Sequence, residues 1–314
     1  AWRLETRSEL ALGEAIVGFA TLRSRAIDLG YDEVVGLVSG QMGRALILGG
    51  RFEEAFVLFE DSLGRRPPPR FRARQHVGLA KVARSRSQDP TPHLERALQA
   101  LGDCNDPPVR IEILNSIGHE HLGRGDPAAA TRFFERALAS SAEDGPLLSV
   151  APLNALGHAL QMAGDLEAAE ARFVEVASMA AVFGGVRPRA IAMLRRAEIQ
   201  VELGRAGAVD ALAEAFEEIS RFSSTEIWAT YHGICVFYGL DRSEVERVEV
   251  SLEALDLLDL PAPYKLQREL IHQLTLWANN EPVDVRLTDR LRESGNAAGA
   301  WTTASTASAK GSNQ

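Results

Sequence analysis

Cysteine, lysine, net positive charge and long apolar runs are all scarce in this sequence, and each shortage excludes a class of protein. Only Cys104 and Cys235 occur in 314 residues. Because they are far apart, we expect no disulfide framework, and a reducing cytoplasmic compartment fits. Lys and Arg number 34 against 43 Asp and Glu, a net charge of −9. This disfavours a nucleic-acid binder, since affinity for phosphate backbones comes from clustered positive charge. No apolar run approaches the roughly 20 residues of a membrane-spanning helix, so we expect no membrane segment.

Motifs that carry catalysis are missing as well. The sequence has no Gly-rich phosphate loop followed by Lys, no nucleophile elbow and no spaced set of Cys and His. The cluster His119-Glu120-His121 has the composition of a metal or acid–base site. However, two histidines two residues apart on a helix point to different faces and cannot chelate one ion. We therefore predict no catalytic residue, no metal site and no cofactor, and we do not expect an enzyme.

What the chain does contain is an internal repeat with a spacing of 39 residues. Two stretches carry the same residue types at the same intervals: Asn115, Gly118, Gly125, Asp126, Ala130 and Phe134, then Asn154, Gly157, Gly164, Asp165, Ala169 and Phe173. Each copy predicts two helices joined at Gly-Asp, because glycine supplies the permissive backbone that ends a helix. The small residue on the first helix lets a neighbour approach closely, and Ala and Phe at i,i+4 on the second form a buried stripe.

This pattern resembles the tetratricopeptide (TPR) repeat, a helix–turn–helix unit that stacks into a superhelix. The resemblance implies an all-α fold, a right-handed α-α superhelix of about seven to eight helix pairs. The period of 39–40 residues is longer than the 34 typical of the family. In this respect the chain also resembles the sensor arrays of bacterial STAND-type signalling ATPases and transcription activators.

We expect the array to span residues 1–293, with its clearest repeats at 31–215. At its start, a helix over about 2–12 is followed by Ala15, Phe19 and Leu22 as a buried row of the second-helix kind. Toward its end we predict helices at 226–238 and 243–258, joined near Gly239, and then at 266–278 and 283–292. Residues 294–314 are small and polar, which predicts a disordered tail or linker. The chain begins without Met and uses few lysines, so we expect a fragment of a larger protein from a GC-rich bacterium.

In the TPR family the first helix of each pair lines a concave groove where partners bind. A polar stripe at i, i+4 and i+7 recurs on these predicted helices: Asn115, His119 and Leu122, then Asn154, His158 and Gln161. An asparagine amide is both donor and acceptor, so it can hold the backbone of an extended peptide. Peptide-binding members of the family often use asparagine here. Alternatively, these are ordinary solvated polar residues.

The segment 65–96 is basic within an acidic chain, with nine Lys and Arg against Asp89 and Glu95. Its densest part holds Arg70, Arg72 and Arg74. Such a patch can receive an acidic partner or a second copy of the chain, as in a homo-oligomer. Alternatively, it is a solvated surface that keeps the protein soluble.

The sequence therefore predicts a protein-interaction or adaptor module that receives a protein or peptide in its groove. A second hypothesis is the effector-sensing domain of a STAND-type regulator, which would bind a small molecule. A scaffold joined to a catalytic domain elsewhere is a third.

Overall fold

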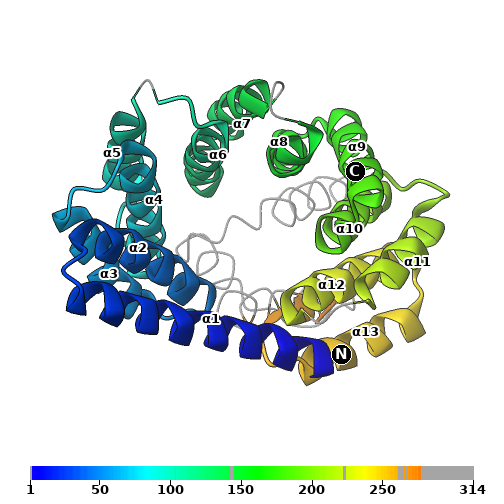
Figure 1. Cartoon of the computed structure of the whole chain (residues 1–314). Helices are drawn as coiled ribbons and strands as arrows, with labels where there is room; N and C mark the ends of the chain where they lie inside the picture. Colours follow the sequence, from blue (N-terminus) through cyan, green and yellow to red (C-terminus); the bar gives the residue numbers. More distant parts are fainter. Residues whose placement is uncertain are drawn as a thin grey trace. The chain divides into compact units, whose positions relative to one another are not determined.

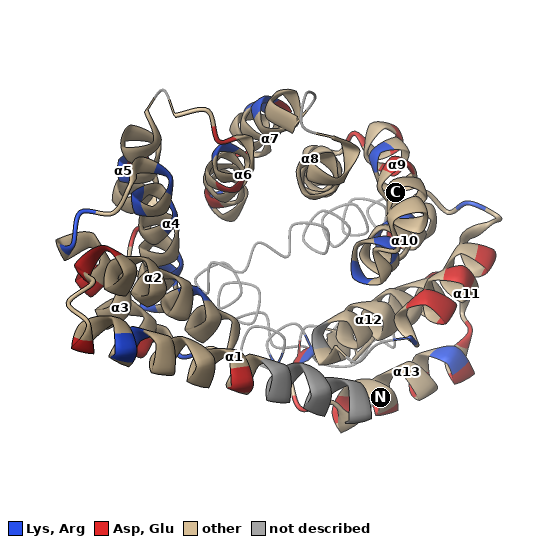
Figure 2. Cartoon of the chain, viewed as in Figure 1, with Lys and Arg blue, Asp and Glu red and all other residues tan. Residues whose placement is uncertain are grey.

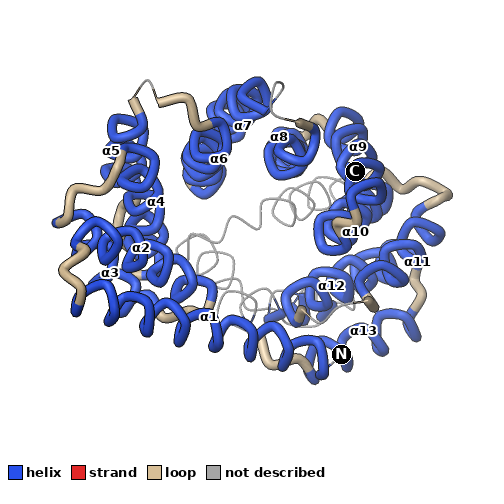
Figure 3. Tube along the Cα trace, viewed as in Figure 1, coloured by secondary structure: helices blue, strands red, loops and turns tan. Residues whose placement is uncertain are grey.

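The computed structural model describes residues 2–102, 104–141, 145–221 and 224–260, together with 265, 268–269, 271–273 and 275–276. Every regular element in this part of the chain is helical, with no strand among the described residues (Figure 3). The elements are α1 (Trp2–Asp28), α2 (Asp32–Leu48), α3 (Phe52–Gly64), α4 (Pro69–Ser85), α5 (Thr91–Leu101), α6 (Pro107–Gly123), α7 (Pro127–Ser141), a 3-10 turn η1 (Pro146–Ser149), α8 (Val150–Ala163), α9 (Leu166–Phe183), α10 (Val186–Glu202), α11 (Ala208–Ile219), α12 (Thr225–Arg242) and α13 (Val245–Leu257) (Figure 1). The all-α prediction is confirmed.

The helices fall into two compact units. Unit 1 holds the residues up to Glu120 and Arg132–Pro152, and unit 2 holds His121–Thr131 and the residues from Leu153 onward. In unit 1, α2 packs on α3 and α4 on α5; in unit 2, α10 packs on α11 and α12 on α13. These are the helix pairs that the repeat predicts.

A glycine–phenylalanine contact forms the centre of the core in both units. The rings of Phe59, Phe134 and Phe173 are almost fully buried. Each ring lies against a glycine of a first helix, so closely that an added Cβ would stand under 3.0 Å from it: Gly43 and Gly78 for Phe59, Gly118 for Phe134, and Gly157 for Phe173. The repeated small residue thus makes room for the repeated aromatic ring, as the spacing predicts.

A series of partly or fully buried polar groups joins the first four helices of unit 1. Arg23 of α1 donates to Ser39 of α2 and to Asp61 of α3, at 2.8 and 2.9 Å. Ser39 itself donates to the same Asp61 oxygen at 2.8 Å. On α4, Gln75 donates to Ser62 of α3 at 2.8 Å. These bonds link α1, α2 and α3 to one another and α3 to α4, and so help to fix how the four helices fit together.

The first helix differs from the prediction. Instead of ending near residue 12, α1 is continuous over Trp2–Asp28, and Ala15 and Leu22 are exposed and Phe19 only half-buried. The predicted buried row is therefore wrong. Of the described α1 side chains, Ala26 is buried, and Ile16 is half-buried and packs against the cluster around Phe59.

The boundary between α12 and α13 also differs. The helix passes through Gly239 and ends at Ser243, which takes a left-handed conformation with φ of 57°. Gly239 serves close packing instead, because an added Cβ would stand 2.8 Å from Val248.

The predicted helix at 266–278 is described only at scattered residues, which are helical. The predicted helix at 283–292 and the polar tail at 294–314 lie outside the described residues. Among the helices that are described, none is both long and apolar enough to cross a membrane.

Candidate functional site

The first polar stripe lies on α6, in unit 1 up to Glu120. Asn115 is half-buried and His119 is exposed. The imidazole of His119 packs edge-on against Phe134, with ring centroids 5.2 Å apart. Although part of the residue stays exposed, this loss of water, together with the nearby Arg84 guanidinium, lowers the pKa of His119. His119 is therefore a neutral donor and acceptor near neutral pH.

The second stripe lies on α8, in unit 2 from Leu153 onward. Asn154 and His158 are both half-buried. They occupy the positions on α8 that Asn115 and His119 occupy on α6. The two helices thus repeat one partly open polar surface, each within its own unit.

The last residue of each stripe is less open than the sequence suggests. Leu122 and Gln161 are only 4% and 5% exposed. Both stand one turn before the corner, where Asp126 and Asp165 donate backbone bonds to His121 and Leu160 and the chain turns back. The open part of each stripe is therefore limited to its asparagine and histidine.

The side-chain amides of these stripes are the notable feature. The Oδ1 atoms of Asn115 and Asn154 are buried and have no hydrogen-bond partner among the described residues, and the same holds for both amide atoms of Gln161. Most buried polar atoms in proteins are paired, and leaving one unpaired costs about 1–3 kcal/mol. Each helix therefore carries an unpaired acceptor that its surroundings shield from solvent.

The three patch arginines all lie on α4 and make different contacts. Figure 2 shows Lys and Arg along α4, where the patch lies. Arg70 lies over the ring of Phe71, 4.7 Å from its centroid. Arg72 is one of the charges near His76. Burial, and then the charges of His93, Arg96 and Arg72, lower the pKa of His76 to about 4. Arg74 lines a small cavity.

That cavity, of about 90 Å³, lies among first helices of unit 1. Its polar lining consists of Arg44 of α2, Arg74 and Lys81 of α4, and Glu112 of α6. Glu112 forms long ion pairs with two of these cations. Its Oε1 atom lies 3.6 Å from Nζ of Lys81 and 3.9 Å from Nη2 of Arg44. The Nε of Arg74 is buried with no hydrogen-bond partner among the described residues. The lining thus has three positive side chains and one carboxylate, so its charges are not balanced and can pair with a second anionic group.

Sequence reasoning missed Arg44 and Glu112 as members of this cavity. The repeat does not mark them. Arg44 stands one residue after Gly43, whereas Lys81 stands three residues after Gly78 and Glu112 six residues before Gly118, so they are not at equivalent repeat positions.

Within the described part of the chain, no three His, Cys, Asp or Glu side chains are grouped so as to hold a metal ion. His121 instead lies 3.7 Å from Asp126.

Compared by sequence, the chain matches no known protein-family model and no curated protein. Compared by structure, it is similar to a tetratricopeptide repeat protein from Parabacteroides merdae, with a TM-score of 0.55 and 16% identity over 88% of this chain and 96% of that one. It is also similar to the pilF protein of Pseudomonas aeruginosa, with a TM-score of 0.50 and 15% identity over 74% of this chain and 91% of that one. At these identities the likeness concerns the fold, an all-α helical solenoid of TPR-like repeats.

Proposed function

We propose that this chain is a protein-interaction module, a part of a larger bacterial regulatory protein, that binds an extended acidic segment of a partner protein. The observation that carries the proposal is one unpaired, buried amide oxygen in each unit, that of Asn115 in unit 1 and that of Asn154 in unit 2. They recur at equivalent positions of two repeats, and each can accept a bond from a backbone N–H of a partner once the asparagine side chain turns outward. Such bonds hold a peptide without reading its side chains.

The small basic cavity supports the acidic character of the partner. Arg44, Arg74 and Lys81 present three positive charges against Glu112 alone. The cavity volume of about 90 Å³ is small, suited to a single carboxylate group rather than a whole ligand. A carboxylate bonded to the free Nε of Arg74 would form a charge-assisted hydrogen bond, the stronger kind.

The test begins with partners recovered by pull-down with this chain as bait, then purified. Titration calorimetry then compares the wild-type chain with Asn115→Ala, Asn154→Ala and the double variant. We expect affinity to weaken by more than about 1 kcal/mol in the double variant, because partner N–H groups lose their acceptors. Folding should be nearly unchanged, since neither asparagine has a hydrogen bond to its Oδ1 to lose. Equal affinities in all four proteins would contradict the proposal.

Effector sensing, as in STAND-type regulators, is a second candidate function, and one observation favours it. Unit 2 has a cavity of about 590 Å³, inside the range of roughly 300–1,000 Å³ that small-molecule sites occupy.

A further inference from the structure

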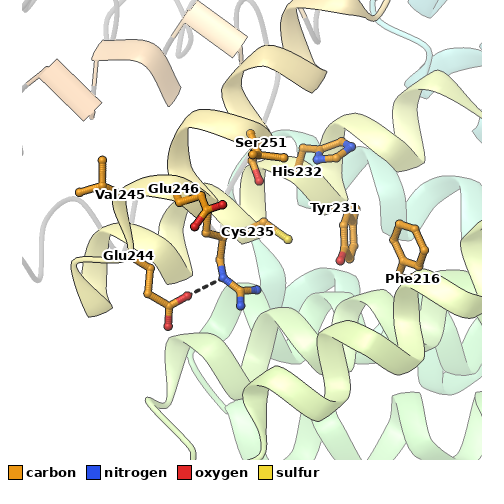
Figure 4. Close-up of a pocket in the computed structure, with 10 residues that line it drawn as sticks. Phe216, Tyr231, His232, Cys235, Glu244, Val245, Glu246 and Ser251 are labelled. Atoms are coloured by element: carbon orange, nitrogen blue, oxygen red, sulfur yellow. Dashed lines mark hydrogen bonds and ion pairs between the residues drawn. The ribbon is translucent and has the colours of Figure 1, made fainter.

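The larger cavity of unit 2 is built by three helices and has two unlike sides. It is lined by Phe216 of α11, by Tyr231, His232 and Cys235 of α12, and by Glu244, Val245, Glu246, Arg247, Val250 and Ser251 at the start of α13 (Figure 4). In Figure 4, Glu244 and Phe216 lie at opposite ends of the lining, with Cys235 between them. One side is therefore aromatic and the other charged.

The aromatic side is a connected cluster. The ring centroids of Phe216 and Tyr231 are 5.7 Å apart, and those of Tyr231 and His232 are 5.4 Å apart, edge to face. Trp228, one turn earlier on α12, stacks on His232 at 5.8 Å and meets Phe216 edge-on at 5.5 Å. Phe216 nevertheless keeps 46% of its surface exposed. Offset and edge-to-face aromatic contacts each contribute about 0.5–1.5 kcal/mol, so this wall can accept one more ring.

The charged side consists of three groups. Arg247 donates from Nε to Oε2 of Glu244 at 2.6 Å, and its guanidinium lies 5.1 Å from the ring centroid of Tyr238. The side chains of Arg247 and Glu244 are 35% and 40% exposed, so a ligand can reach both. Glu246, two residues after Glu244, is exposed as well.

The remaining polar groups of the lining stay neutral. Burial lowers the pKa of His232 and raises that of Cys235. Burial and the neighbouring Cys235 also raise the pKa of Tyr231. The cavity therefore presents one positive and two negative charges near neutral pH, beside aromatic rings.

This combination selects against singly charged and uncharged ligands. A lone anion drawn to Arg247 would meet Glu244 and Glu246, and a lone cation drawn to those carboxylates would meet Arg247. A plain hydrocarbon would desolvate the Arg247–Glu244 pair and Glu246 without offering any of them a new partner. A molecule with both charges satisfies each group, since its carboxylate can pair with the guanidinium and its ammonium with the carboxylates.

We propose that this cavity binds a free amino acid with an aromatic side chain, held by Arg247 at its carboxylate, by Glu244 and Glu246 at its ammonium, and by Phe216 and Tyr231 at its ring. The effector-sensing function supplies the biological role of such a site. Binding itself is measured on this chain alone, so a failure to bind protein partners leaves the inference standing, and the reverse also holds.

The first experiment uses the unmodified chain. L-tryptophan and L-phenylalanine are titrated in by calorimetry, beside tryptamine, which lacks the carboxylate, and indole-3-propionate, which lacks the ammonium. We expect saturable binding of one ligand per chain for the amino acids and at least about ten-fold weaker binding of both indole analogues than of tryptophan. No saturable binding of either amino acid would overturn the proposal. Equal binding of tryptophan and its analogues would overturn the zwitterion assignment.

The second experiment locates the site. Phe216→Ala and Arg247→Gln should each weaken binding at least about ten-fold, while Phe183→Ala, at 46% exposure a matched aromatic on α9, should not. Glu246→Gln, at an exposed position, tests the ammonium contact without risk to folding and should weaken binding too. Binding that survives Phe216→Ala, Arg247→Gln and Glu246→Gln, or that falls equally in Phe183→Ala, would place the ligand elsewhere.

Discussion

The ring of Phe134 lies directly on Gly118, where an added Cβ would stand 2.4 Å from ring atom Cε1. Real Cβ atoms do not approach an aromatic ring so closely. The Phe134 ring can therefore take this position only because residue 118 has no side chain. Phe173 and Gly157 form the same contact in unit 2.

Phe134→Ala and Phe173→Ala should each lower the free energy of unfolding by about 3–5 kcal/mol, because each leaves a cavity in a core that cannot fully collapse. Urea melts followed by circular dichroism measure this. Phe183→Ala, half-exposed at the end of α9, is the control and should cost far less. Small losses at both core positions would mean that the repeat register is wrong.

Gly118→Ala should also destabilise, by about 1–3 kcal/mol, since the new methyl group must displace the Phe134 ring. Gly123→Ala on the same helix meets nothing within 4 Å. There the better helix propensity of alanine should leave stability unchanged or raise it by up to about 1 kcal/mol. Similar effects of the two substitutions would contradict the close packing described at Gly118.

Asp61→Ala should cost about 1–3 kcal/mol, because Arg23, Ser39 and Arg65 all lose an acceptor in a partly buried setting. The matched control is Glu53→Ala. Its carboxylate also pairs with an arginine, Arg86, but is 74% exposed, and exposed pairs contribute little. Thermal melts of the two variants should differ clearly, and equal losses would contradict a structural role for the network.

Stability should fall as the pH drops from about 6.5 toward 4, in part because of His76. The folded protein lowers the pKa of this histidine to about 4 from 6.5, through burial, His93, Arg96 and Arg72. The unfolded chain therefore binds a proton more readily, so the stabilisation is complete above pH 6.5 and is lost as the pH falls toward 4. His76→Gln should flatten the dependence of melting temperature on pH in this window. An unchanged slope would contradict the burial of a neutral imidazole.

Reversing the charge of Arg70, Arg72 and Arg74 should slow association with an acidic partner and flatten its salt dependence. Of these three arginines only Arg74 lines the basic cavity, so the effect should depend mainly on Arg74. Arg74→Glu alone should reproduce most of the effect in stopped-flow measurements, and Arg70→Glu little of it. Association rates that do not change with salt concentration would contradict a contact between these arginines and an acidic partner.

If His119 contacts an acidic group of the partner, affinity should rise on acidification, but only below pH 6.5. The ordinary imidazole pKa is 6.5, and partial burial and Arg84 lower it here. Calorimetry at pH 7.5 and 5.5, with His119→Gln as control, measures the change. A rise centred above 6.5 would show that another group titrates.

The repeat made much of the fold predictable. Gly118 and Gly157 lie on first helices with a close neighbour, as predicted, and the structure adds that this neighbour is a phenylalanine, as it is for Gly43 and Gly78. Ala208, Leu212 and Ala215 are buried as an apolar row even where the motif weakens. These positions are predictable because period and side-chain size together determine how a helix pair packs.

The wrong predictions arose where one sequence feature is compatible with two different structures. A glycine can end a helix or admit a neighbour, and Gly239 does the second. The apolar row around Phe19 has helical spacing whether or not anything covers it. The basic cavity and the aromatic cavity join residues of different helices, which no single stretch of sequence displays. Only the run Trp228, Tyr231 and His232, at i, i+3 and i+4, could have pointed to an aromatic surface on α12.

The bonds of Arg23 have a mechanical consequence. Its guanidinium joins α1 to Ser39 of α2 and, at the same point, to Asp61 of α3. A repeat array whose units touch only their neighbours unravels one unit at a time under tension. Here Arg23 carries a pull on α1 beyond α2 to α3, so we expect the three helices to resist tension together.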